Sequence, residues 1–238
     1  MAFPNCWHKV ISLLTDAGHF SARVVTKLMM IENRIETGAL GYLHPGWDEQ
    51  YYPEGLPEDW RLDYYSHHFR FVLMKPDEWL SSSGDDINQW LQDVTDSFKF
   101  FLSIDAVDVN DKVIEQISLI KSGLAGQLQG LVIMQYDSHL PDVIMKALCA
   151  LTTVHVDTDK TDQLPVEVKP CWRKARPVPG SVIGFLSREE SKDIRVMRAY
   201  IEDFIKVCDP QQAYLVYEGD PPPSKTMQDA QVILQMLM

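Results

Sequence analysis

Residues 35–74 decide the fold: they read IETGALGYLHPGWDEQYYPEGLPEDWRLDYYSHHFRFVLM. The segment opens with a strand-like run, Ile35–Tyr42, and closes on a second one, Phe69–Met74. Short apolar runs of this kind are typical of strands that are covered on both faces. Glycine, proline and aromatic residues fill the stretch between them, as expected of a connecting loop. The segment therefore predicts two strands of an α/β sheet.

The same pattern continues along the rest of the chain. Five more strand candidates follow: Phe98–Ile104, Leu131–Tyr136, Thr153–Asp157, Val182–Leu186 and Ala213–Tyr217. Segments with apolar residues at helical spacing lie between most of them, and the clearest runs from Ile194 to Cys208. Strands that alternate with helices predict right-handed βαβ units and a parallel sheet. Seven strand candidates suit either a barrel or a doubly wound open sheet.

One segment interrupts the alternation, at residues 159–180. Four prolines fall in it, namely Pro165, Pro170, Pro177 and Pro179. Prolines at this density exclude a normal crossover helix, so we expect about one βα unit to be missing here. An incomplete barrel exposes strand edges, which proteins cover by pairing, by charge or by oligomerisation. We predict that this segment covers the edge, or that a second copy of the chain does so in a homodimer.

Composition and charge bound the class of protein. The 238 residues are 45% hydrophobic and 24% charged, which is ordinary globular usage and enough for one large domain. The net charge of −12 makes the chain acidic and disfavours nucleic acid as a partner. The densest basic stretch lies between Lys169 and Arg176, and we interpret it as a solvated loop.

Cysteine usage and hydropathy address the cellular compartment. Four cysteines occur without a close pair, which predicts reduced thiols rather than disulfides or a structural zinc site. No apolar run reaches membrane-spanning length, so we expect no membrane association. The apolar run after Lys9 is cut short at Thr15 and Asp16, so we do not interpret it as a signal peptide. We therefore predict a cytoplasmic protein.

The first 33 residues differ from the rest. Lys9, Arg23 and Lys27 stand against the single acid Asp16 in residues 1–29, a charge of +2 in an otherwise acidic chain. We predict that residues 1–33 form a leader outside the fold and that residues 34–238 form the domain. The alternative is an ordinary amphipathic helix, because apolar residues between Val10 and Ala17 have helical spacing.

A family resemblance follows from the loop after the first strand. Gly38–Tyr42 and Trp47 precede the run Tyr52-Pro53-Glu54-Gly55-Leu56-Pro57. These residues resemble the opening of the YecE-like family, domain-of-unknown-function family 72. Fainter echoes at Phe98–Leu102 and Tyr214–Asp220 extend the resemblance over about residues 34–238. It implies a TIM-barrel-like (βα)7-8 parallel barrel, here truncated by about one βα unit.

The sequence departs from that family where polar motifs are expected. Val72–Lys75 stands in place of the family's "VE-x-N", and Ile183–Leu186 occupies the strand that should carry "RLHG". Tyr217-Glu218-Gly219 replaces "FNN". The chain is thus a divergent member by resemblance, and the resemblance itself supplies no reaction.

Polar side chains at the carboxyl ends of the strands are the candidate site, because barrel enzymes place their sites there. Candidate catalytic residues are Asp137, His139, His155, Asp157 and Glu218. Candidate ligand-binding residues are Tyr42, His44, Trp47 and Gln135. The cofactor is unknown; a divalent metal on Asp137 and Asp157 is one candidate, since hard cations prefer oxygen ligands. For His155 we favour a hydrogen-bonded structural role over a ligand role.

Two classes of function stay open at this point. The missing motifs favour a degenerate family member that acts as a binding or interaction protein. The alternative is a metal-assisted hydrolase or isomerase that acts on a small polar or sugar-like ligand at the barrel mouth. The sequence does not decide whether the chain is an enzyme.

Overall fold

The computed structural model describes residues 35–48, 50–137, 140–209 and 211–237. The proposed leader, residues 1–33, lies outside the described residues. Eight strands occur in the described part, in chain order β1 Ile35–Ala39, β2 Phe71–Met74, β3 Lys99–Asp105, β4 Leu128–Met134, β5 Val154–Val156, β6 Val168–Pro170, β7 Ile183–Leu186 and β8 Ala213–Tyr217. The α-helices between and after them are α3 Arg61–Ser66, α4 Pro76–Trp79, α5 Gly84–Asp93, α6 Asp111–Leu124, α7 Asp142–Leu151, α8 Arg188–Ser191, α9 Ile194–Val207 and α10 Ser224–Leu237.

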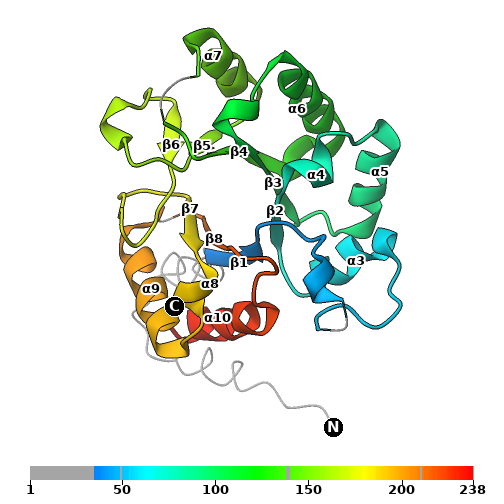
Figure 1. Ribbon diagram of the computed structural model, residues 1–238, viewed down its shortest axis with the longest axis vertical. Helices are drawn as coiled ribbons and strands as arrows, with labels where there is room; N and C mark the ends of the chain where they lie inside the picture. Colours follow the sequence, from blue (N-terminus) through cyan, green and yellow to red (C-terminus); the bar gives the residue numbers. More distant parts are fainter. Residues whose placement is uncertain (1–34, 49, 138–139, 210, 238) are drawn as a thin grey trace, which may run out of the picture. The chain divides into compact units, whose positions relative to one another are not determined.

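The strands pair in parallel throughout, in two sheets. One sheet has the order β2-β3-β4-β5-β6 and the other β1-β8-β7. Isolated parallel bridges link the two sheets, Leu40 to Leu73 at one junction and Trp172 to Gly184 at the other. The strands therefore follow one another around a ring, but among the described residues no continuous ladder closes it. The fold is α/β with parallel sheets, as the sequence predicts, and Figure 1 shows the longer helices outside the strands.

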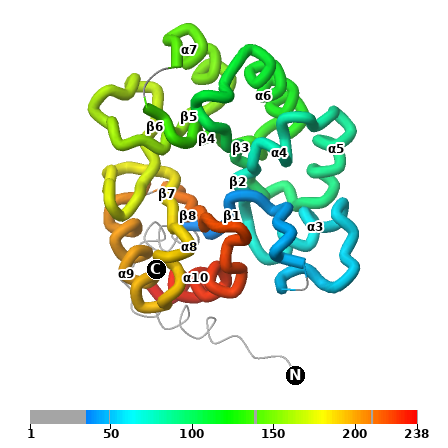
Figure 2. Tube along the Cα trace, viewed as in Figure 1, coloured from blue at the N-terminus to red at the C-terminus, as the bar shows by residue number. Residues whose placement is uncertain are grey.

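The proline-rich segment holds a strand that the sequence did not reveal. β6 pairs with β5 through Val154–Val168 and Val156–Pro170. What this part of the chain lacks is helices: only a short 3₁₀ turn, Thr161–Gln163, separates β5 from β6. The unit that we expected to be missing has thus lost its helices and kept its strand. Figure 2 shows loops without α-helices before and after β6.

The same segment covers the edge of β7. The Trp172 N–H donates to the Ile183 carbonyl at 2.8 Å, and the Phe185 N–H donates to the Trp172 carbonyl at 3.0 Å. The segment that follows β6 thus forms the backbone hydrogen bonds with β7 that a neighbouring strand would form. This agrees with the first of the two ways in which we expected the edge to be covered. A homodimer through this edge stays a prediction.

At the other junction, a tyrosine and a glycine join β1 to β2. The Ala39 N–H donates to the Tyr65 hydroxyl at 2.8 Å, and that hydroxyl donates to the Phe71 carbonyl at 3.0 Å. A Cβ at Gly38 would lie only 2.6 Å from the Phe71 carbonyl oxygen. Glycine is therefore required for this close approach of the two strands.

The core has two parts, because successive strand residues face opposite sides. The larger part lies between strands and helices; α9, for example, contributes Met197, Ile201 and Phe204 to it. The smaller part forms the interior of the ring: Phe71, Leu73, Phe101, Val132, Cys171, Ile183, Phe185, Tyr214 and Val216. No helix in the described part is long and apolar enough to cross a membrane.

Candidate functional site

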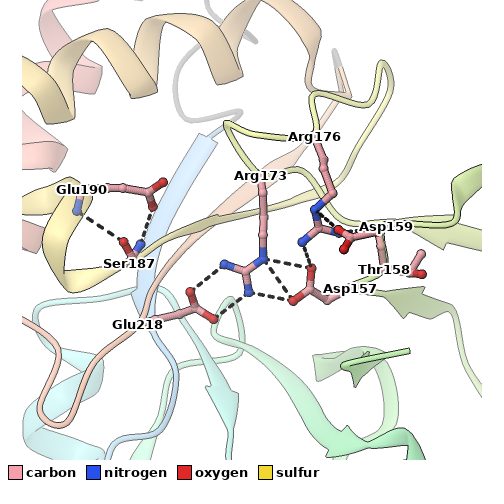
Figure 3. Close-up of polar contacts among 8 residues, drawn as sticks. All are labelled: Asp157, Thr158, Asp159, Arg173, Arg176, Ser187, Glu190 and Glu218. Atoms are coloured by element: carbon pink, nitrogen blue, oxygen red, sulfur yellow. Dashed lines mark hydrogen bonds and ion pairs between the residues drawn. The ribbon is translucent and has the colours of Figure 1, made fainter. Parts of the chain in front are cut away.

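Three strands bring charged side chains together through Arg173. Asp157 directly follows β5, Glu218 directly follows β8, and Arg173 lies three residues after β6. Arg173 donates from Nε to Asp157 Oδ1 and Oδ2 at 2.9 and 3.0 Å, and from Nη2 to Oδ2 at 2.7 Å. It also donates from Nη1 and Nη2 to Glu218 Oε2 and Oε1, both at 2.8 Å. Figure 3 shows the guanidinium between the two carboxylates, so one cation links carboxyl ends of both sheets.

Arg176 extends the cluster on the same loop. Its N–H donates to the Arg173 carbonyl at 2.8 Å, which turns the two arginines to one side. Arg176 Nη2 contacts Asp157 Oδ1 at 2.9 Å and Nε contacts Asp159 Oδ1 at 2.7 Å, while Nη1 donates to the Thr158 carbonyl. The expectation of a solvated basic loop is therefore wrong for Arg173 and Arg176, whose side chains are only 22% and 24% exposed.

Hydrogen bonds and opposite charges keep Asp157 and Arg173 ionised against the effect of burial. Burial alone would raise the pKa of Asp157, but hydrogen bonds and charge from Arg173, and then from Arg176, outweigh it and hold that pKa below its usual range. Burial would lower the pKa of Arg173, but the hydrogen bonds that it donates to Glu218 and Asp157 raise that pKa instead. Both shifts point away from neutral pH. The arrangement therefore offers fixed charges and hydrogen bonds, and neither Asp157 nor Arg173 is set up to exchange protons near neutral pH.

The guanidinium also lies over the interior of the ring. Arg173 Cζ is 4.6 Å from the centroid of the Phe185 ring, on a strand of the inner core. This cation–π contact fixes the arginine over an apolar floor. The partly exposed polar cluster therefore rests on an apolar residue of the inner core.

A second group of expected residues packs the loop after β1. Trp47 and His44 are each 1% exposed, and Tyr42 is buried at 6%. Trp47 Nε1 donates to the Pro222 carbonyl at 2.7 Å; His44 Nε2 contacts the Leu40 carbonyl at 2.9 Å, and His44 Nδ1 lies 3.3 Å from Asp220 Oδ1. These three candidates hold the loops after β1 and β8 against the ring.

Glu78 organises the same loop and was not foreseen. It is 8% exposed. Its Oε1 accepts from the Tyr42 and Leu43 N–H groups at 2.7 Å, and its Oε2 accepts from the Lys75 N–H at 2.7 Å. Burial raises the pKa of Glu78, although these three hydrogen bonds partly offset it. A glutamate three residues into a short helix is a capping signal that sequence inspection can find.

The remaining candidates at the carboxyl ends do not join the cluster. Gln135 is exposed, with a left-handed backbone at φ 51°. The backbone carbonyl of Asp137 accepts from Lys160 Nζ at 3.1 Å. His139 lies outside the described residues. Among the residues that the structure describes, no three His, Cys, Asp or Glu side chains gather as a metal site.

His155 lies inside the ring but faces the opposite end from Asp157. It lines a cavity with Gln129, Thr153 and Gln212, residues at or just before the starts of β4, β5 and β8. Its Nδ1 is buried without a hydrogen-bond partner in the described part of the chain. The expectation of a hydrogen-bonded structural histidine is therefore wrong for this nitrogen.

The comparisons with known proteins agree with this architecture. Residues 36–109 match the family model described as "Protein of unknown function DUF72". Over these residues the chain is similar to the DUF72 family. The matched region holds the β1 loop and Glu78, whereas Asp157, Arg173 and Glu218 lie beyond it. No curated protein matches the sequence at a significant level.

Solved structures of DUF72 family proteins share the fold. One from Thermotoga maritima has 11% sequence identity and a TM-score of 0.62, and the match covers 85% of this chain and 100% of that chain. One from Enterococcus faecalis has 8% identity and a TM-score of 0.54, with 87% of this chain and 98% of that chain covered. At such low identity these matches establish the DUF72 fold and no activity.

Proposed function

We propose that this chain is a binding protein, and that it holds a small neutral, hydroxyl-rich molecule over the Asp157–Arg173–Glu218 cluster. The observation that carries the proposal is the doubly bidentate Arg173, which fixes two carboxylates in one geometry. Fixed donors and acceptors of this kind suit adjacent hydroxyl groups, which both donate and accept. Pre-organised polar groups lower the entropic cost of binding.

Charge supports a neutral ligand over an anion. Three carboxylates, Asp157, Asp159 and Glu218, are joined to two guanidiniums, Arg173 and Arg176. The cluster thus carries one more negative charge than positive, and it offers an anion no net attraction. Glu218 and Arg173 keep 20% and 22% of their side chains exposed, so both are partly accessible to solvent.

The metal-assisted alternative gains no support from the same residues. Both carboxylate oxygens of Asp157 accept hydrogen bonds from guanidinium groups, so a cation at this carboxylate would have to displace Arg173 or Arg176. Such displacement would leave a partly buried arginine without its partner, which is costly. Binding without a metal is therefore the simpler account of this geometry.

A thermal-shift panel tests the proposal. The purified chain is heated with millimolar D-glucose, D-xylose, myo-inositol or inorganic phosphate. We expect at least one neutral compound to raise the melting temperature, and phosphate to have no effect. Glu218→Gln should weaken that binding about 10-fold, the cost of losing one charged hydrogen-bond acceptor. The matched control is Glu189→Gln on α8, where Glu189 is exposed and pairs with Lys192. This variant should bind as the wild type does.

A metal series in the same assay separates the two classes. Mg²⁺, Mn²⁺ and Zn²⁺ are each compared with EDTA. A resident metal at about 100 times its Kd would add roughly 2.7 kcal/mol, on the order of 5–10 °C in a domain of this size. We expect no shift. A selective shift that is lost in Asp157→Ala and kept in Asp137→Ala would overturn the binding account in favour of the metal-assisted enzyme.

A further inference from the structure

The end of the ring opposite to the Arg173 cluster holds a cavity of about 190 Å³. Residues at or next to the amino-terminal ends of the strands line it, among them Gln129, Thr153, Val182 and Gln212. An apolar cavity of about 150 Å³ is enough to bind benzene. This cavity therefore has room for a ligand of that size, and it is separate from the site proposed above.

Buried polar atoms in the cavity wall lack partners. His155 is 1% exposed and Tyr214 is 2% exposed. Neither His155 Nδ1 nor the Tyr214 hydroxyl has a hydrogen-bond partner among the described residues. Leaving such an atom unsatisfied costs about 1–3 kcal/mol, so unsatisfied atoms of this kind need an explanation. A ligand that reaches the cavity wall would give them partners.

Residues of the neighbouring strands surround the His155 side chain. Val132 on β4 and Lys169 on β6 flank His155 in register. A Cβ at Gly130 would lie 3.1 Å from His155 Cδ2, so glycine makes room for the imidazole. Phe101 then contacts both rings, with centroids 6.0 Å from His155 and 4.7 Å from Tyr214. The cavity thus has an aromatic wall as well as polar groups.

Of the groups without partners, the Tyr214 hydroxyl can donate a hydrogen bond, and His155 can donate one from Nδ1 in the tautomer that carries its proton there. Burial, and then the charge of Lys169, lowers the pKa of His155 to about 3, so the imidazole is neutral and carries one N–H. Burial, and then the charge of Glu36, raises the pKa of Tyr214, which keeps its O–H. Lys169 also lines the cavity and forms no ion pair with a described residue. Two neutral donors and one ammonium group call for an acceptor with negative charge.

Two carboxylates stand near these donors. Asp209 lines the cavity, and its Oδ1 accepts from the Gln211 N–H at 2.7 Å. Glu36 is the register partner of Tyr214; burial raises its pKa, and the charges of Arg70 and Lys99 act in the opposite direction. One acid is thus engaged by the backbone, and the other has two cations near it.

From these contacts we propose that the amino-terminal end of the ring binds a small carboxylate with an aromatic or similarly flat body, its carboxylate on Lys169, His155 and Tyr214. Barrel folds place their active sites at the other end, so this site does not depend on the function proposed above. The aromatic wall suits the flat body, and the three donors suit the carboxylate oxygens.

Benzoate and benzamide test the inference on the full chain, since they share a shape and differ in charge. Thermal-shift titration gives both affinities. We expect benzoate to bind about 10-fold more tightly than benzamide, because a charge-assisted hydrogen bond is roughly twice as strong as a neutral one. Lys169→Gln should remove that preference. Lys112→Gln on α6 is the matched control and should keep it.

Tyr214→Phe is a second test variant, chosen because it should fold as the wild type does. The Tyr214 hydroxyl has no hydrogen-bond partner among the described residues, so the variant should melt at the wild-type temperature or above, yet bind benzoate several-fold more weakly. The inference is overturned if benzoate does not stabilise the wild type, if benzamide binds equally well, or if Lys169→Gln and Tyr214→Phe both bind benzoate as the wild type does.

Discussion

Replacing Arg173 by methionine should destabilise the fold by about 3 kcal/mol. Breaking a buried ion pair by removing one partner typically costs 3–5 kcal/mol, because the other charge stays buried. Here Asp157 is 9% exposed, and Arg173 and Glu218 are 22% and 20% exposed. This partial exposure places the loss at the lower end of that range. Each kcal/mol lowers the melting temperature by about 2–4 °C at this size, so we expect a decrease of about 6–12 °C.

The pH dependence of this loss tests its cause. Arg173 and Arg176 hold the folded-state pKa of Asp157 below its unfolded value of about 3.9. The stability that this contributes is therefore present above about pH 4 and is lost as pH falls through the folded-state pKa. The difference between wild type and Arg173→Met should thus be largest near pH 7 and shrink toward pH 3.

Urea unfolding followed by circular dichroism at several pH values gives both quantities. Lys174→Met is the matched control, since Lys174 lies on the same loop as Arg173. It pairs with Asp203 of α9 while 42% of its side chain stays exposed. This substitution should cost about 1 kcal/mol or less. The reasoning fails if Arg173→Met costs no more than Lys174→Met, or if its deficit is unchanged on acidification.

Three further predictions concern the two ends of the ring and the leader. The folded-state pKa of His155 is about 3, so between about pH 3 and 6.5 a proton binds to this histidine in the unfolded chain but not in the folded one. Wild-type stability should therefore fall by up to roughly 1.4 kcal/mol per pH unit on acidification in this range. His155→Phe should flatten this pH dependence of the unfolding free energy. Equal slopes in urea titrations would contradict this. Tyr65→Phe should cost about 1–3 kcal/mol in the same assay by leaving the Ala39 N–H without its acceptor, whereas Tyr64→Phe should cost less; equal losses would count against the role of Tyr65. Deleting residues 1–29 should leave the melting temperature nearly unchanged, and a large drop would show that they belong to the fold.

The strands were predictable because most are apolar on both faces. The run Val182–Leu186 contains β7, and Ala213–Tyr217 is β8. β6 escaped detection because it is three residues long, contains Lys169 and ends on Pro170. Proline is tolerated in such short strands, where few ladder hydrogen bonds are required of it. The proline density of residues 159–180 thus correctly predicted the absence of a crossover helix, but it wrongly suggested that no strand would form there.

Of the Asp157–Arg173–Glu218 cluster, only the two acidic residues were predictable from the sequence. Asp157 and Glu218 follow strands directly, and parallel strands place their carboxyl ends together. Arg173 could not be found in this way, because a basic residue among prolines resembles a solvated loop. Only the turn of that loop over Phe185 brings the guanidinium between the carboxylates. Composition and local pattern carry no information on such a contact, which is set by the path of the chain between β6 and β7.

A crystal structure of the chain grown with the neutral sugar or polyol that stabilises it most tests the central claim most directly. We predict ligand hydroxyl groups within hydrogen-bond distance of Glu218 and Arg173, with Arg173 still linking Asp157 to Glu218. A ligand bound elsewhere, or an Arg173 side chain that leaves both carboxylates, would contradict the account.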